Sequence, residues 1–371
     1  MGGLMEKFKE IFTNLQDPRA ANARHLLPDV LVIALAATMC GAESCADMAD
    51  FGCAKEALLR QFLPLPHGIP SHDTFSRVFR LLDAKAFEAV FREFMASFAK
   101  SSALDLSGVV AIDGKALRGA FERGRQATPL HMVNVWAADA GVVLAQCMAP
   151  DRNEVAGALE VLRLLSLEHC IVTADALHCH RRMGQTILDK GGNYVLALKE
   201  NQSALYSDAA LLFRRAGPRG TATQLEPSTH DRREQRTATV VRNTSLAIKH
   251  EFPGIVAVAR ITSRRRVKGR PADDPLVRYF LLSKYLPAER LLEVVRSHWG
   301  IENQLHWVLD VAFDEDANRA RKDNAPENLA VVRGLALNIL RSHPGRASIR
   351  RKIKRAGWDN AFLLSLLSHM R

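Results

Sequence analysis

The first hundred residues carry apolar side chains at helical spacing rather than in strict alternation. A Pro- and Gly-rich stretch at 64–70 interrupts this pattern. Ser71 is placed to cap the helix that follows it, and Asp83 is placed to cap the next one. We therefore predict a small helical domain over 1–104. Its helical segments are LPDVLVIALAATMCG, CADMADFGCAKEALLRQFL, HDTFSRVFRLL and DAKAFEAVFREFMASFAK.

Beyond residue 107 the pattern changes to short, β-branched runs separated by turn residues. Three runs joined by turns predict an antiparallel meander, namely GVVAID, LHMVNVWAAD and GVVLAQCMAP. Two strand segments, HCIVTAD and NYVLALK, then alternate with the helical segments EVAGALEVLRLL and RRMGQTILDKGG. This order matches an α/β, ribonuclease-H-like fold, and we predict that catalytic domain over 105–371.

An insertion is predicted at about 203–285, before the helix that would complete the core. Strand-like runs fill it, and residues 214–278 hold 15 basic against 6 acidic side chains. The segment 341–371 holds 8 against 1, whereas residues 1–100 hold 11 against 12. Clustered cations are expected where a protein binds phosphate backbones, although solvated surfaces also carry them. The candidate DNA-binding residues of the insertion are Arg232, Arg233, Arg264, Arg265, Arg266, Lys268 and Arg270.

The composition is that of a globular protein, with 47% hydrophobic and 25% charged residues and a net charge of +11. The longest apolar stretch, 30–39, is too short to cross a bilayer, so we expect no membrane association and a cytoplasmic location. The six cysteines form no CxxC pair, so neither a zinc knuckle nor a disulfide framework is predicted.

Three acidic residues stand out by their settings. Asp113 and Asp175 are each predicted to end a strand, and Glu302 borders the apolar face of a predicted helix. Three carboxylates drawn from distant segments suit Mg²⁺ or Mn²⁺, which prefer oxygen ligands. Each acid also has a simpler interpretation, as a turn residue, a helix cap or a surface acid. Four later acids compete with Glu302 for the third position: Asp310, Asp314, Glu315 and Asp316.

Five motifs together resemble the DDE transposases of bacterial insertion sequences, in their H-repeat-associated branch. They are GIPSHDTFSRVF, AIDGKALRGA, TADALHCH, YVLALKENQ and HWGIENQLHWVLDVAFDED, and the resemblance covers about 10–371. It implies a ribonuclease-H-like core, an associated N-terminal helical domain, and metal-dependent cutting and joining of double-stranded DNA. The acids that match the family's three are Asp113, Asp175 and Glu302.

The chain departs from the wider DDE pattern around the glutamate. That pattern has Tyr, Arg and Lys where this chain has Val295, His298 and Leu309. His298 could replace the arginine as a phosphate donor, and Lys199 and Asn201 are the other candidates. The triplet of His298, Glu302 and His306 also allows a zinc site, although no catalytic motif such as HExxH accompanies it. Trp299 and Trp307 are predicted to be core residues, with stacking on a flipped base as the alternative.

The sequence therefore predicts a transposase that cleaves insertion-sequence ends and joins the 3′-hydroxyl to target DNA by two-metal phosphoryl transfer. A dimer or larger assembly is expected in the complex that holds two ends. Two alternatives stay open: a ribonuclease-H-like nuclease without strand transfer, and a non-catalytic DNA-binding relative.

Overall fold

The structure is a computed structural model that describes residues 8, 10–102, 104–121, 129–215, 221–225, 232–267 and 274–369. Its N-terminal part is helical, as predicted. The helices are α2 (Leu27–Met39), α3 (Cys45–Ala54), α4 (Glu56–Leu59), α5 (His72–Leu81) and α6 (Ala84–Ser101). Asp83 caps α6 by accepting a hydrogen bond from the backbone of Ala86. Ser71 precedes α5 but makes no capping bond, because its hydroxyl lies 3.3 Å from that of Thr74 instead.

A mixed sheet forms the centre of the molecule. Its first strands are β1 (Gly108–Phe121), β2 (Pro129–Ala137), β3 (Val142–Met148), β4 (Cys170–Ala174) and β5 (Asn193–Leu198). The first three form an antiparallel meander, while β4 pairs with β1 and β5 in parallel. Helix α7 (Glu154–Arg163) lies in the connection from β3 to β4, and helix α8 (Arg181–Asp189) lies in the connection from β4 to β5. The predicted ribonuclease-H-like arrangement is confirmed by this topology.

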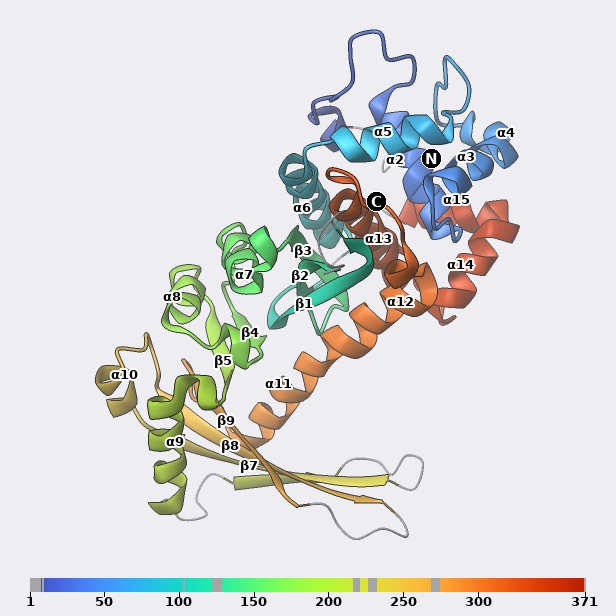
Figure 1. Ribbon diagram of the computed structural model, residues 1–371. Helices are drawn as coiled ribbons and strands as arrows, with labels where there is room; N and C mark the ends of the chain where they lie inside the picture. Colours follow the sequence, from blue (N-terminus) through green and yellow to red (C-terminus); the bar gives the residue numbers. More distant parts are fainter. Residues whose placement is uncertain are drawn as a thin grey trace.

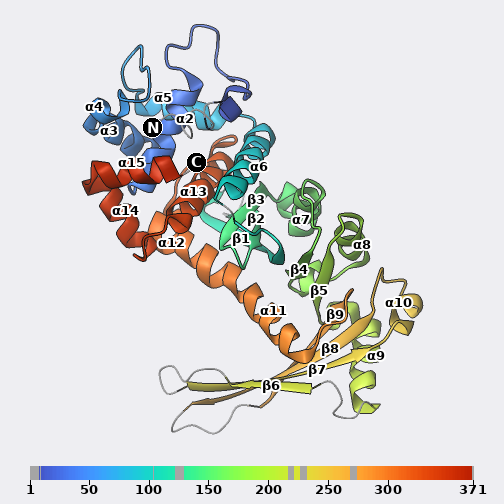
Figure 2. The same cartoon turned by 180° about the vertical axis from the view of Figure 1, so that it is seen from behind.

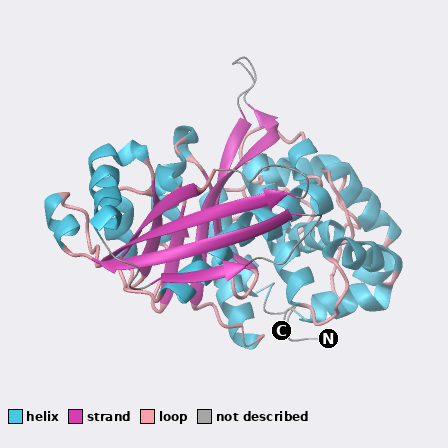
Figure 3. Ribbon diagram, turned by 90° about the horizontal axis from the view of Figure 1, so that it is seen from below, coloured by secondary structure: helices cyan, strands magenta, loops and turns pink. Residues whose placement is uncertain are grey.

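The insertion continues the same sheet rather than folding apart from it. It contains α9 (Ser203–Arg215), β6 (Thr221–Leu225), β7 (Arg232–Arg242), α10 (Ser245–Lys249), β8 (Ala257–Val267) and β9 (Leu276–Leu282). Because β9 pairs with β5, the nine strands run in the order β3-β2-β1-β4-β5-β9-β8-β7-β6. In Figure 3, which is seen from below, the long strands of the insertion cross in front of the other strands, and Figure 2 shows β6 at the far edge.

A long helical segment leads from the insertion back to the core. It consists of α11 (Ala288–Gly300), one stretch of π-helix (Ile301–His306) and α12 (Trp307–Phe313). In Figure 1 this orange segment runs from the insertion strands past β1 towards the helical end of the molecule. Helix α11 contacts β1, β4, β6 and β7, so it ties the insertion to the two strands that carry the aspartates.

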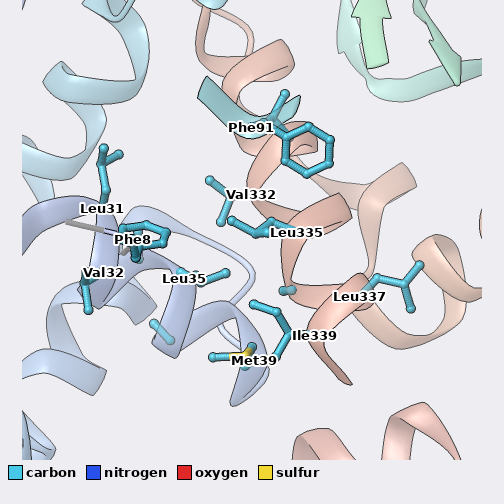
Figure 4. Packing of buried hydrophobic residues seen from close by; sticks show 14 of the residues in the cluster. Phe8, Leu31, Val32, Leu35, Met39, Phe91, Val332, Leu335, Leu337 and Ile339 are labelled. Atoms are coloured by element: carbon cyan, nitrogen blue, oxygen red, sulfur yellow. The ribbon is translucent and has the colours of Figure 1, made fainter. Parts of the chain in front are cut away.

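The C-terminal helices pack against the N-terminal ones. They are α13 (Ala325–Ser342), α14 (Ile349–Trp358) and α15 (Asn360–His369). Figure 4 shows Leu35 and Met39 of α2 facing Leu335 and Ile339 of α13 in one apolar core. The Asn338 side chain bonds both backbone groups of Val143, which holds α13 on the edge strand β3. The domain boundaries predicted at 104 and 105 stay a prediction.

Two tryptophans are not where the sequence suggested. Trp299 is 41% exposed and Trp307 is 60% exposed, so neither is a core residue. The buried face is formed by Ile301 and Leu305, and each tryptophan is two residues away from one of them. Two residues rotate a side chain to nearly the opposite face of a helix. Across the described ranges, no helix is both long and apolar enough to cross a bilayer.

Candidate active site

Asp113 and Asp175 lie at the same level of the sheet because β1 and β4 are parallel neighbours. Ile112 pairs with Ala174 at the end of the β1–β4 ladder, and each aspartate immediately follows one of these two residues. The prediction that Asp113 ends a strand is wrong, since β1 continues to Phe121 by pairing with β2. Asp175 does follow β4 and accepts a hydrogen bond from the backbone of Leu177, so it also caps the short turn after it.

Glu302 lies in the π-helical stretch. Ile301 and Leu305 are fully buried, whereas the Glu302 side chain is 54% exposed. In this stretch the Asn303 side-chain amide donates a hydrogen bond to the Trp299 carbonyl at 3.1 Å. Single π-helical turns are frequent at functional sites.

The fold brings Asp113, Glu302 and His306 together. One potential ligand atom from each lies within 4.8 Å of the others. His306 Nδ1 is 3.7 Å from an Asp113 oxygen and 3.6 Å from a Glu302 oxygen. Asp175 is outside this group, but it is close enough for its charge to raise the Asp113 pKa. Asp113 and Glu302 are therefore in contact range of each other, and Asp175 lies close to Asp113.

The two contacting carboxyl groups have opposite pKa shifts. Burial, followed by the Glu302 carboxylate and the Asp175 charge, raises the pKa of Asp113 to about 8. Donation from the His306 ring, opposed by partial burial, lowers the pKa of Glu302 to about 2. At neutral pH the pair therefore shares one proton, as expected when like charges lie close together without a cation.

Among the described residues, no Lys or Arg forms an ion pair with Asp113, Asp175 or Glu302. The competing acids are arranged differently. Lys115 lies 2.6 Å from Asp310, 3.3 Å from Glu315 and 3.1 Å from Asp316, and buried Arg333 lies 3.6 Å from Glu315. The first set has hard oxygen donors and an unbalanced negative charge, which fits Mg²⁺ or Mn²⁺. The second set already has its cations.

The three candidate phosphate partners near the acids differ in their availability. His298 Nδ1 lies 3.1 Å from the Thr173 hydroxyl, and burial lowers the pKa of His298, so its ring is neutral at pH 7. Asn201 donates to the Ala176 carbonyl at 2.8 Å and so supports the turn after Asp175. Lys199 is exposed at the end of β5 and is free to contact solvent or a ligand.

The arginines of the insertion lie on long strands. Arg264, Arg265 and Arg266 are exposed near the end of β8. The backbone of Arg232 and Arg233 belongs to β7 and pairs with this part of β8. Lys268 and Arg270 lie outside the described residues.

Three residues of this site were not identified from the sequence. His306 was considered only as a partner of Glu302 or as part of a zinc site. Asn134 of β2 pairs with Asp113 across the sheet, and Gln146 of β3 pairs with Asn134. Both are 1% exposed. A polar residue in an otherwise apolar strand was the available signal, but its partner depends on the strand register.

Comparison with known proteins identifies the family. Residues 105–339 match the transposase DDE domain, and residues 9–95 match the region associated with it. This chain belongs to the DDE transposase family. It is 31% identical over 357 residues to "Putative transposase YncI" of Escherichia coli O157:H7, covering 93% of this chain and 90% of the relative.

Two further similarities extend the comparison. The chain is 30% identical over 374 residues to "H repeat-associated putative transposase YhhI" of Escherichia coli K12, covering 98% of each. The predicted H-repeat-associated relationship is thereby confirmed. Among solved structures, a cryo-EM piggyBac transposase synaptic complex with hairpin DNA matches with a TM-score of 0.42 and 13% identity. That match covers 99% of this chain and 78% of the other.

Proposed function

We propose that this DDE transposase cleaves DNA at the ends of its own element and joins the freed 3′-hydroxyl to target DNA. The observation that carries the proposal is the group of Asp113, Asp175 and Glu302, which forms no ion pair with a Lys or Arg among the described residues. A carboxylate set of this kind is costly to a fold unless a cation binds there. The neighbouring acids around Lys115 already pair with that cation and do not require a bound ion.

The three carboxylates would hold Mg²⁺ or Mn²⁺. When bound, such ions polarise the phosphate, activate the attacking water or hydroxyl, and stabilise the leaving oxygen. Asp113 would bind as a carboxylate, and its shared proton would leave the site beforehand. The sheet fixes both aspartates, and the half-exposed Glu302 closes the site from the helix side. Because cleavage and joining are both in-line displacements, one site can serve both.

Two basic surfaces would bind the DNA. One consists of Arg264, Arg265 and Arg266 on β8, with Arg232 and Arg233 of the paired strand as further candidates. The other is the exposed side of α14, which carries Arg350, Arg351, Lys354 and Arg355. Such contacts position a duplex without reading its sequence. Lys199 and His298 would contact phosphate nearer to the acids, with His298 acting as a neutral donor.

Strand transfer separates this proposal from a nuclease that only cuts. The substrate is a labelled duplex made from the DNA flanking the coding region, supplied with its 3′ end already exposed, together with a supercoiled target plasmid and Mg²⁺. We expect labelled joint molecules. Cutting of an intact end without joining would favour the nuclease, and binding without cutting would favour the non-catalytic relative.

The basic surface on β8 has its own test. Replacing Arg264, Arg265 and Arg266 by Gln should weaken binding to every DNA sequence and flatten the dependence of log affinity on log salt. The slope should change by about 0.9 per lost phosphate contact. The matched control removes three exposed cations from helices instead, in the variant Arg77→Gln, Lys100→Gln and Arg163→Gln. Equal slopes in both variants would remove the β8 surface from the DNA interface.

Holding two element ends requires at least two copies of a protein with one active site. We therefore propose a dimer or larger assembly on DNA. Light scattering with and without end DNA would test this, and a single chain per pair of joined ends would contradict it.

A further inference from the structure

A buried chain of polar side chains leads from the edge of the sheet to the acids. Gln146 Nε2 donates to Asn134 Oδ1 at 2.7 Å, and Asn134 Nδ2 lies 3.3 Å from His306 Nε2. These side chains come from β3, β2 and the π-helical stretch, and all three are at least 94% buried. Polar groups in such a setting are held by their partners, because water does not replace a lost hydrogen bond there.

A backbone group favours one direction of donation along this chain. Asn134 Nδ2 lies 3.5 Å from the carbonyl oxygen of Met132, which can only accept. The amide nitrogen of Asn134 therefore faces Met132 and His306, and its oxygen faces the amide nitrogen of Gln146. A donor on Asn134 requires an acceptor on His306, so His306 Nε2 carries no hydrogen.

We propose that Asn134 and Gln146 are positioning residues that hold His306 in the tautomer with hydrogen on Nδ1. This proton faces Asp113 and Glu302, whose oxygens are 3.7 and 3.6 Å away. His306 then stabilises the carboxylate pair as a donor and is not a third ligand of the metal. Only the statement that His306 is not a metal ligand rests on the proposed function.

The fold makes room for this chain at some cost. A Cβ atom on Gly334 of α13 would lie 2.4 Å from Gln146 Oε1, so any larger residue there would displace the Gln146 amide from its present position. Glycine within a helix costs about 0.5–1 kcal/mol relative to alanine. It is retained in the middle of an 18-residue buried helix, at the point where Gln146 needs the space.

The alternative is that His306 binds the metal through Nδ1. The three residues are close enough for this arrangement. An imidazole ligand would shift the preference of the site towards Zn²⁺ and other borderline metals, whereas three carboxylates favour Mg²⁺ and Mn²⁺. The two interpretations differ in which ring nitrogen carries the hydrogen, and this is measurable without DNA or metal.

The first experiment is ¹⁵N NMR of the full-length, metal-free protein with labelled histidines. The His306 signals are assigned by their loss in His306→Gln. We expect hydrogen on Nδ1 and none on Nε2. Hydrogen on Nε2 in the wild-type protein would overturn the proposal. Because this readout needs no activity, a failure to cleave DNA would overturn the proposed function and leave this inference standing.

The second experiment reverses the direction of hydrogen-bond donation between residue 134 and His306. Asn134→Asp presents a carboxylate to Nε2, so hydrogen should move to Nε2 and free Nδ1 as a ligand. Zn²⁺ affinity relative to Mg²⁺ affinity, measured by calorimetry, should then rise about tenfold or more. Asn153→Asp is the matched control, since its side chain caps α7 and aspartate caps equally well. An unchanged tautomer in folded Asn134→Asp would overturn the role of Asn134. If that variant does not fold, the wild-type spectrum still decides.

Discussion

Asp113 and Lys115 lie two residues apart on β1 and on the same face of the sheet, yet they belong to opposite kinds of site. Around Lys115, two buried or half-buried cations meet three acids at ion-pair distance. Around Asp113, three acids form no ion pair with a Lys or Arg of the described residues, and burial raises the pKa of Asp113 to about 8. The difference lies in the presence of partners rather than in the number of acids.

This contrast separates a structural cluster from the proposed functional one. The ion pairs that Lys115 of β1 makes with Asp310 and Glu315 stabilise the junction of β1, α12 and the turn Glu315–Ala317. Acids without cations raise the energy of the metal-free fold and so favour binding of an ion. The choice of Glu302 over Asp316 as the third acid follows from this comparison, because Asp316 is already paired with Lys115.

The largest expected effect is on catalysis. Asp113→Asn and Asp175→Asn should each lower Mg²⁺-dependent cleavage about a thousandfold or more, since the loss of metal stabilisation is worth several kcal/mol. DNA binding should persist, because the basic surfaces are elsewhere. Gel assays of cleavage and binding on one labelled duplex check both points. Wild-type cleavage in either variant would remove that aspartate from the site.

Glu302→Gln should also eliminate cleavage and strand transfer at all practical Mg²⁺ concentrations, whereas Asp316→Asn should leave measurable activity. Both substitutions replace a carboxylate by an amide, one in the group around Asp113 and the other in the cluster around Lys115. A titration of Mg²⁺ and Mn²⁺ on a labelled element end compares them. An inactive Asp316→Asn with an active Glu302→Gln would reverse the assignment.

Removing Lys115 should affect the stability of the fold more than catalysis. Lys115→Met leaves buried acids without their cation, which costs about 3–5 kcal/mol of the free energy of unfolding. Asp113→Asn is the control from the other cluster and should raise that free energy at pH 7, because the unfolded Asp113 is ionised there whereas the folded one must bind a proton. Denaturant unfolding without metal measures both. Equal losses would remove the distinction between the clusters.

The smallest effect is a pH dependence. Because the pKa of Asp113 is raised above its unfolded value, the metal-free fold binds the extra proton and loses stability as pH rises from about 4 to 8. Metal must displace that proton, so Mg²⁺ affinity should rise by about tenfold per pH unit up to pH 8 and then level off. Calorimetry over pH 6–9 tests this. A flat profile would mean that Asp113 is ionised without metal.

The sequence predicted what depends on local pattern. The strand and helix order, the aspartate after β4 and the buried stripe through Ile301 and Leu305 all follow from periodicity. What it missed depends on neighbours far away in the sequence. The continuation of β1 beyond Asp113 required β2 as a partner, and the link between Asn134 and His306 required the strand register and the helix position together. The acids near Lys115 competed with Glu302 for the third position in the sequence, and their pairing with Lys115 depends on contacts that the sequence does not show.

Divalent metal binding tests the central claim most directly. Mn²⁺ affinity should be measured without DNA for the wild-type protein and for Asp113→Asn, Glu302→Gln and Asp316→Asn. The account predicts that the first two variants lose binding while Asp316→Asn retains the wild-type affinity within about threefold. Retained binding in Asp113→Asn and Glu302→Gln, with loss in Asp316→Asn, would place the metal in the Lys115 cluster and contradict the account.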